Sequence, residues 1–289
     1  MNALSWNMIT RLLQLFLAYK DDPRVKLVIL KGQGKAFCAG GDVRPVICDI
    51  VQGLGKWRLG ADFFSDQYTL NYVMATYSKI QISIMNGIVM GGGAGVSIHG
   101  RFRIATEKTV FAMPETELGL FPDVGASYFL SRLPGFFGEY VGLTGARLDG
   151  AEMLACGLAT HFVPSTEREA IQKPDEWISA TLRALKKASP ASLKISLRSI
   201  REGRFQEVGQ CLIREYRMRS LQHRVLITQG VRAVVIDKDR KPKWEPQRLE
   251  QVTDNMVDQY FKRMDEEEGW EDLKLPPRIN LSSSIIAKL

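Results

Sequence analysis

The sequence predicts a layered α/β fold in which short strands lead into loops at a common edge of a sheet. Two observations predict it. Short β-branched apolar runs occur at residues 25–30 and 82–85, and each leads into a glycine-rich loop and then into helical spacing of apolar residues. Such alternation is typical of α/β cores. At 289 residues and 45% hydrophobic composition, the chain suffices for one large domain or two small ones.

Charge and cysteine content exclude several classes of protein. The net charge of +7 is spread along the chain, and no basic arm, zinc-finger spacing or RNA-binding signature is present, so we expect no nucleic-acid partner. The four cysteines and three histidines show neither disulfide-framework nor metal-ligand spacing. No apolar run reaches the length of a membrane span. A solvated basic surface is the favoured interpretation, with attraction of an anionic small molecule as the alternative.

The first part of the chain supplies the predicted strands and loops. Ser5 is expected to cap a helix that ends near Asp21, and residues 25–30 form the first buried strand before the glycine-rich loop at residues 31–42. The following elements are a helical stretch over residues 46–77, a strand over 82–85, a short helix over 95–99, and strands over 102–106 and 109–112.

Helices dominate the rest of the chain. Asp149 and Glu152 have the spacing of a capping box for a helix over residues 150–157. The expected elements after it are a strand over 159–163, helices over 176–188, 191–202 and 206–222, and a last helix capped by Thr253. These patterns divide the chain into a core over residues 1–164, a helical region over 165–270 and a flexible tail over 271–289.

Two glycine loops, Ala39-Gly40-Gly41 and Gly91-Gly92-Gly93, each follow a predicted strand. If the strands are neighbours, one backbone N–H from each loop can bind the same oxygen, which would form an oxyanion hole. The alternative is that these glycines serve only tight turns and close packing.

Two carboxylates lie downstream, in M-P-E-T-E-L-G-L-F-P-D. Glu115 and Asp123 stand in otherwise apolar sequence, where a carboxyl group tends to have a raised pKa and can act as base, acid or nucleophile near neutral pH. The alternatives are a surface role for Glu115 and, for Asp123, an N-cap of a helix over residues 124–132. Their combination with two glycine loops favours catalysis.

At this point the sequence resembles the crotonase (enoyl-CoA hydratase/isomerase) superfamily. The motifs are K-A-F-C-A-G-G-D at residues 35–42, N-G-I-V-M-G-G-G-A-G at 86–95 and A-M-P-E-T-E-L-G-L-F-P-D-V-G at 112–125. With L-T-G-A-R-L-D-G at 143–150 and S-P-A-S-L-K-I-S-L-R at 189–198, they most resemble the 3-hydroxyisobutyryl-CoA hydrolases, and their plant peroxisomal branch in particular. The resemblance implies a spiral of ββα turns with a helical C-terminal region, and acyl-CoA substrates with no further cofactor.

The resemblance also implies roles for single residues. The N–H groups of Gly41 and Gly92 would bind the thioester oxygen. Glu115 would attack the carbonyl carbon or activate water, and Asp123 would orient or protonate, so that 3-hydroxyisobutyrate and CoA are released in a step of valine breakdown. Hydratases of the superfamily carry a first catalytic glutamate where this chain has Gly95, which favours a hydrolase over a hydratase or isomerase.

The chain also departs from the family. The family has strands before the segment that matches Asn2 to Ser5, so we expect the first strands of the core to be missing, and it has a helical stretch between the residues matching Ser165 and Trp177 that is mostly absent here. Gln67 stands where the family places a substrate-contacting glutamate; an amide can bind substrate by hydrogen bonds but cannot take up a proton. These departures keep open a shortened, non-catalytic paralogue that binds acyl-CoA or a partner subunit without turnover.

The last three residues, Ala287-Lys288-Leu289, resemble the S-K-L type of peroxisomal address, with alanine in place of serine. A chance tripeptide is the alternative. We expect the address, and with it a peroxisomal import receptor as partner and the peroxisome as location; a homo-oligomer is left open.

Overall fold

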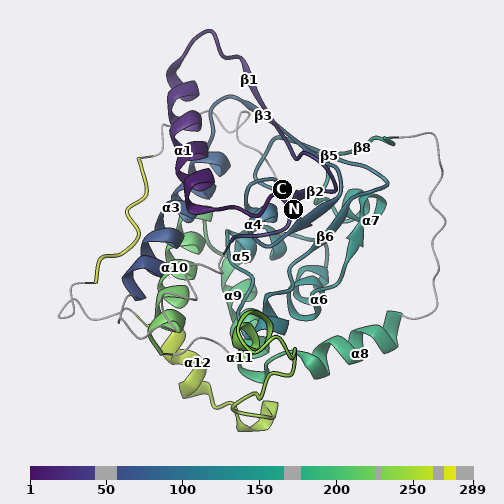
Figure 1. The fold of residues 1–289 in the computed structure, drawn as a ribbon, viewed down its shortest axis with the longest axis vertical. Helices are drawn as coiled ribbons and strands as arrows, with labels where there is room; N and C mark the ends of the chain where they lie inside the picture. Colours follow the sequence, from purple (N-terminus) through teal and green to yellow (C-terminus); the bar gives the residue numbers. More distant parts are fainter. Residues whose placement is uncertain (43–56, 166–176, 226–228, 263–269, 278–289) are drawn as a thin grey trace.

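The computed structural model describes residues 1–42, 57–165, 177–225, 229–262 and 270–277 (Figure 1). Two four-stranded sheets form its centre. The first has the parallel order β1 (Leu27–Lys31), β3 (Ile80–Met85), β5 (Phe102–Ala105) and β8 (His161–Phe162). The second has the order β2 (Ala36–Cys38), β4 (Ile88–Met90), β6 (Val110–Ala112) and β7 (Leu148–Asp149), with β7 antiparallel to β6.

The strand order confirms the predicted spiral. Each successive pair, β1 with β2, β3 with β4 and β5 with β6, gives one strand to each sheet, and equivalent strands of successive turns lie side by side. Between β3 and β4 the chain turns at Gly87, whose φ is 86° and where a Cβ would overlap the Lys35 carbonyl. Only glycine is compatible with this corner.

Helices cover the sheets and fill the second half of the described chain. In order they are α1 (Trp6–Asp21), α3 (Trp57–Ala75), α4 (Gly92–Gly95), α5 (Ala126–Leu130), α6 (Phe137–Thr144), α7 (Gly150–Ala155), α8 (Trp177–Lys187), α9 (Pro190–Gly203), α10 (Val208–Val225), α11 (Gln229–Val235) and α12 (Asp254–Phe261), with 3-10 turns η1 (Glu115–Leu118) and η2 (Leu249–Gln251). None of the described helices is long and apolar enough to cross a membrane.

Three predicted helix caps are present. The Ser5 hydroxyl accepts a hydrogen bond from the Met8 N–H at the start of α1. Asp149 and Glu152 form the predicted capping box at the start of α7. Thr253 caps α12. Local side-chain chemistry was therefore sufficient to predict where these helices begin.

Other elements differ from the prediction. Strands β2 and β4 lie in stretches that we interpreted as loops, because three residues are too few to show strand alternation. The helix expected over residues 95–99 begins earlier, at Gly92. The helix expected from residue 124 begins at Ala126 with Gly125, at φ 86°, in the N-cap position, so the Asp123 side chain does not cap it.

The sheet region and the helical region share one hydrophobic core. Leu212 and Tyr216 of α10 belong to the same buried cluster as Phe64 and Tyr68 of α3. The start of the predicted tail also packs on this body, because Leu273 is buried in that cluster and Asp272 pairs with Arg217 of α10. This attachment differs from the expected flexibility of residues 271–277. The domain boundaries themselves stay predictions, and residues 278–289 lie outside the described residues.

Candidate active site

The two glycine loops lie next to each other, as the oxyanion-hole hypothesis requires. Gly41 follows β2 and Gly92 opens α4, and a Cβ on Gly92 would lie only 3.0 Å from the Gly41 nitrogen. Among the backbone hydrogen bonds that the described residues make in turns and loops, none is donated by the N–H of Gly41 or of Gly92. Two backbone donors are thus available side by side, which is the arrangement of an oxyanion hole.

Chain segments far apart in sequence hold these donors in place. The Leu4 N–H donates to the Gly40 carbonyl at 2.8 Å, and the Asp42 N–H donates to the Leu4 carbonyl at 2.8 Å. These two bonds form a parallel bridge between Leu4 and Gly41, which fixes the first loop. On the other side, a Cβ on Gly93 would overlap the Cys38 carbonyl. The glycine run therefore lets α4 approach β2 closely.

Glu115 begins the 3-10 turn η1 directly after β6. Its side chain is buried, with Oε1 2.8 Å from where a Cβ on Gly91 would lie, and its Oε2 has no hydrogen-bond partner. Burial and the negative charge of Asp123 raise the pKa of Glu115 to about 8. A carboxyl group with such a pKa changes its protonation near neutral pH and can serve as nucleophile or base.

Asp123 has the opposite environment. Its Oδ2 accepts hydrogen bonds from the Tyr68 hydroxyl at 2.6 Å and from Arg219 Nη2 at 2.6 Å and Nε at 3.2 Å. The Arg219 guanidinium is itself buried and lies 4.7 Å from the ring centre of Phe64 and 5.4 Å from that of Phe121. Asp123 is thus fixed in a buried ion pair, with its charge close enough to act on Glu115.

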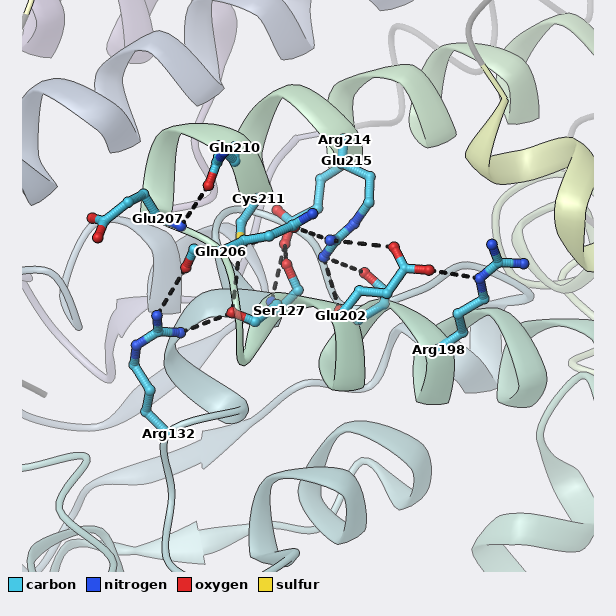
Figure 2. Close-up of polar contacts among 12 residues, drawn as sticks. Ser127, Arg132, Arg198, Glu202, Gln206, Glu207, Gln210, Cys211, Arg214 and Glu215 are labelled. Carbon is cyan, nitrogen blue, oxygen red and sulfur yellow. Dashed lines mark hydrogen bonds and ion pairs between the residues drawn. The ribbon is translucent and has the colours of Figure 1, made fainter.

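A third buried carboxylate supports the turn after Asp123. Glu215 of α10 accepts hydrogen bonds from the Ser127 N–H at 3.0 Å and the Ser127 hydroxyl at 2.5 Å (Figure 2). It also accepts one from the Gly125 N–H at 2.7 Å. Burial raises the pKa of Glu215 to about 7. This side chain joins the helical layer to the loop that carries Asp123.

Two amides of α3 face α4. Gln67 Nε2 lies 2.8 Å from where a Cβ on Gly92 would be, and Asn71 Nδ2 lies 2.9 Å from the same point on Gly95. Both side chains are buried. Gln67, predicted to contact substrate, is therefore next to the predicted oxyanion glycine.

Four of the predicted residues lie together at α4: Gly41, Gly92, Glu115 and Gln67. The fifth, Asp123, raises the pKa of Glu115 through its negative charge. Their roles stay predictions. Arg219 and Glu215 were not predicted from the sequence. Tyr68, among the aromatics of residues 63–77, was interpreted as a core residue, with the wall of an acyl pocket as the alternative. A signal was present, because the two α10 residues are four apart on the face that also carries the buried Val208, Cys211, Leu212 and Met218. Charged residues at apolar-face positions indicate buried pairs.

The arrangement is suited to acyl transfer from a thioester. Two backbone N–H groups can hold a carbonyl oxygen as it gains negative charge, and a carboxyl group with a free oxygen can act on the neighbouring carbon. Among the described residues, no group of three His, Cys, Asp or Glu side chains could hold a metal ion.

Comparison with known proteins gives the family. The sequence model of the enoyl-CoA hydratase/isomerase family matches residues 1–174 and 167–261. Two Arabidopsis thaliana proteins, named probable 3-hydroxyisobutyryl-CoA hydrolase 3 and 3-hydroxyisobutyryl-CoA hydrolase 1, are 62% and 61% identical over 99% and 100% of this chain and 93% and 92% of their own. The crystal structure of an enoyl-CoA hydratase from Rhodobacter sphaeroides 2.4.1 superposes with a TM-score of 0.82 at 29% identity, covering 90% of each chain.

The same comparisons locate an internal difference. The alignment to the first relative spans 354 positions, although this chain has only 289 residues, so the relative has internal residues that this chain lacks. The family model matches the chain as two segments that overlap at residues 167–174, between Ser165 and Trp177, where a helical stretch of the family was expected to be missing. Together the two segments cover well over half of the chain. The chain belongs to the enoyl-CoA hydratase/isomerase family and, within it, to the 3-hydroxyisobutyryl-CoA hydrolases.

Proposed function

We propose that this chain hydrolyses the thioester of 3-hydroxyisobutyryl-CoA and releases 3-hydroxyisobutyrate and CoA. One observation carries the reaction type: Glu115 is a buried carboxyl group whose Oε2 lacks a hydrogen-bond partner and whose other oxygen borders the Gly91–Gly92 loop. The names of the Arabidopsis relatives support the choice of acyl group.

In the proposed mechanism the carbonyl oxygen of the thioester lies between the N–H groups of Gly41 and Gly92. Ionised Glu115 either attacks the carbonyl carbon, forming an anhydride that water then cleaves, or takes a proton from the water that attacks. In both routes the C–S bond breaks, water supplies the new acid oxygen, and the thiolate of CoA takes up a proton. Asp123 orients or protonates. Loss of one oxyanion donor would reduce the rate about 10²–10³-fold.

Hydration of an enoyl-CoA is the second candidate. Addition of water to a double bond needs a positioned base and acid, and in hydratases of the superfamily one of them stands at the position of Gly95. A Cβ there would lie 2.6 Å from the Val124 Cβ and 2.9 Å from Asn71 Nδ2, so the space beside Gly95 is already filled. This crowding favours hydrolysis, and a crotonyl-CoA hydration assay separates the two activities.

A shortened, non-catalytic acyl-CoA-binding protein is the third candidate. It is favoured by Gln67 at a position where the family has a glutamate and by the internal residues that the relatives have and this chain lacks. Its mark would be binding of CoA thioesters, seen by calorimetry, with no release of thiol.

The test is thiol release from 3-hydroxyisobutyryl-CoA by the full chain and two variants. Glu115→Ala should lower kcat/KM at least ~10³-fold, because it removes the group that acts on the carbonyl carbon. Glu117→Ala is the matched control. It removes an exposed glutamate from the same 3-10 turn, one that pairs with Lys187 at the surface, and it should change kcat/KM less than about twofold. Thiol release that survives Glu115→Ala would contradict the proposal.

We further propose that Ala287-Lys288-Leu289 directs the chain to the peroxisome through an import receptor, where the reaction would serve valine degradation. The support is the tripeptide itself, at the end of the sequence. An N-terminal fluorescent fusion should co-localise with peroxisomes, and deletion of Leu289 should release it into the cytosol. Unchanged location after this deletion would rule out the address.

A further inference from the structure

Three buried side chains around α4 have polar atoms without partners. They are Glu115 Oε2, Gln67 Oε1, and both Oδ1 and Nδ2 of Asn71. An unpaired buried polar group loses its hydrogen bonds to water without replacing them, and native structures keep few such groups. Other described residues, such as Gln81, also have unpaired buried atoms. The set around α4 differs because its side chains border Gly91, Gly92 and Gly95, next to the candidate oxyanion donors, where a bound ligand can complete their hydrogen bonds.

The positions of the two amides define a line along α4. Gln67 and Asn71 are four residues apart on α3 and therefore lie on the same face. Gln67 borders Gly92 and Asn71 borders Gly95. These glycines are three residues apart in the sequence of α4, about 4.5 Å along a helix axis. Asn71 thus lies about one turn beyond the glycine that would hold the carbonyl oxygen.

The proposed substrate has a hydroxyl group at a matching place. In a 3-hydroxyacyl thioester the hydroxyl-bearing carbon is two carbons from the carbonyl carbon, so a carbonyl oxygen held at Gly92 leaves the hydroxyl a few ångströms further along the acyl chain. An asparagine amide offers both a donor and an acceptor. A hydroxyl group needs both.

We propose that Asn71 determines acyl specificity by hydrogen-bonding the hydroxyl group of a 3-hydroxyacyl thioester. The inference rests on the proposed function, whose acyl-CoA class it sharpens. The polar atoms of Asn71 and Glu115 Oε2 are all closed to solvent in the free protein. Binding of a thioester therefore requires a movement that opens the site at both side chains.

The chain contains a control for this proposal. Gln81, at the start of β3, is another buried amide whose oxygen and nitrogen lack partners, but it borders Gly100 rather than the glycines of the site. Replacement of either amide by leucine removes an unpaired buried polar group, so each variant should keep its melting temperature or raise it. Only the change at Asn71 should alter specificity.

The experiment compares thiol release from 3-hydroxyisobutyryl-CoA and from isobutyryl-CoA, which differs only by the missing hydroxyl. The wild-type chain should prefer the hydroxylated thioester in kcat/KM by about 10²-fold or more, because an unmet amide penalises the analogue. Asn71→Leu should collapse this ratio at least tenfold, mostly by loss on the hydroxylated substrate. Gln81→Leu should preserve it.

Two outcomes would overturn the proposal. The wild-type chain could show equal kcat/KM for the two thioesters, or the Asn71→Leu variant could keep the wild-type ratio, including by losing both activities equally. If the wild-type chain releases thiol from neither substrate, the proposed hydrolysis fails, and calorimetric titration with the same two thioesters tests the inference. Tighter binding of the hydroxylated thioester that Asn71→Leu abolishes would then support it, and equal binding would refute it.

Discussion

Glu115 and Glu215 are both buried glutamates with raised pKa, yet their surroundings differ. Glu215, in the helical layer, receives three hydrogen bonds from Gly125 and Ser127, whereas Glu115, beside the glycine loops, has an oxygen with no partner. A buried carboxylate with all its donors in place holds a structure together; one that lacks them is available for a ligand. The helical layer and the candidate active site thus place the same kind of side chain in opposite surroundings.

The largest sudden effect on stability is expected when Asp123, a buried carboxylate that has its donors as Glu215 does, loses them. Arg219→Met removes two of the three hydrogen bonds to Asp123 Oδ2 and leaves a buried carboxylate with only Tyr68. The free energy of unfolding should fall by about 3–5 kcal/mol, measured by urea denaturation. Arg217→Met, which breaks a partly exposed pair on the same helix, is the control and should cost about 1 kcal/mol or less.

A smaller loss is expected at Glu215. Glu215→Gln places an amide nitrogen among donors from Gly125 and Ser127, so at least one hydrogen bond is lost and a repulsive contact replaces it. Unfolding free energy should fall by about 1–3 kcal/mol, while thiol release by the folded protein stays within about tenfold. A loss of thiol release well beyond tenfold in the folded variant would mean that Glu215, like Glu115, acts in the reaction, and would contradict the distinction between the two residues.

A third effect, gradual rather than sudden, is a dependence of stability on pH. Both glutamates have a folded-state pKa above the ordinary 4.5, about 8 for Glu115 and about 7 for Glu215, so the folded state favours their protonated forms. Their contribution to stability is fully present below about pH 4.5 and is lost as pH rises through 7 and 8. Each group adds a slope of at most about 1.4 kcal/mol per pH unit.

Glu115→Gln isolates one half of this slope. The variant cannot ionise at position 115, so its urea midpoint should fall less between pH 5.5 and pH 8 than that of the wild-type chain. Identical slopes in the two proteins would show that Glu115 does not titrate in this range.

The sequence was informative where the signal is local. β-branched runs, the Ser5 cap and the Asp149–Glu152 capping box predicted elements that the structure contains. The two glycine loops were predicted to meet if their strands are neighbours, because loops after neighbouring strands lie at one edge of a sheet. The place of Glu115 beside them was implied by the family resemblance. The short strands β2 and β4 carried too few residues for a periodic signal.

The parts that sequence reasoning missed depend on tertiary packing. Nothing near Asp123 in the sequence shows that its partner is Arg219, 96 residues away on α10. The alternative in which Asp123 caps the following helix was wrong, because Gly125, with its positive φ, occupies the N-cap position. The unpaired atoms of Asn71 are visible only in the structure, since an asparagine within a helical pattern is unremarkable by itself.

The bridge between Leu4 and Gly41 has a consequence for how the protein responds to heat. The bridge lies outside the two sheets, and only two backbone hydrogen bonds hold it around one of the two donors of the candidate site among the described residues. Such isolated contacts open more readily than strands paired in the core. Opening of this bridge would displace one donor of the candidate active site while the sheets stay intact. We therefore expect thermal inactivation to precede global unfolding, with the amides of Leu4 and Asp42, which the bridge protects, exchanging with deuterium before those of the sheets.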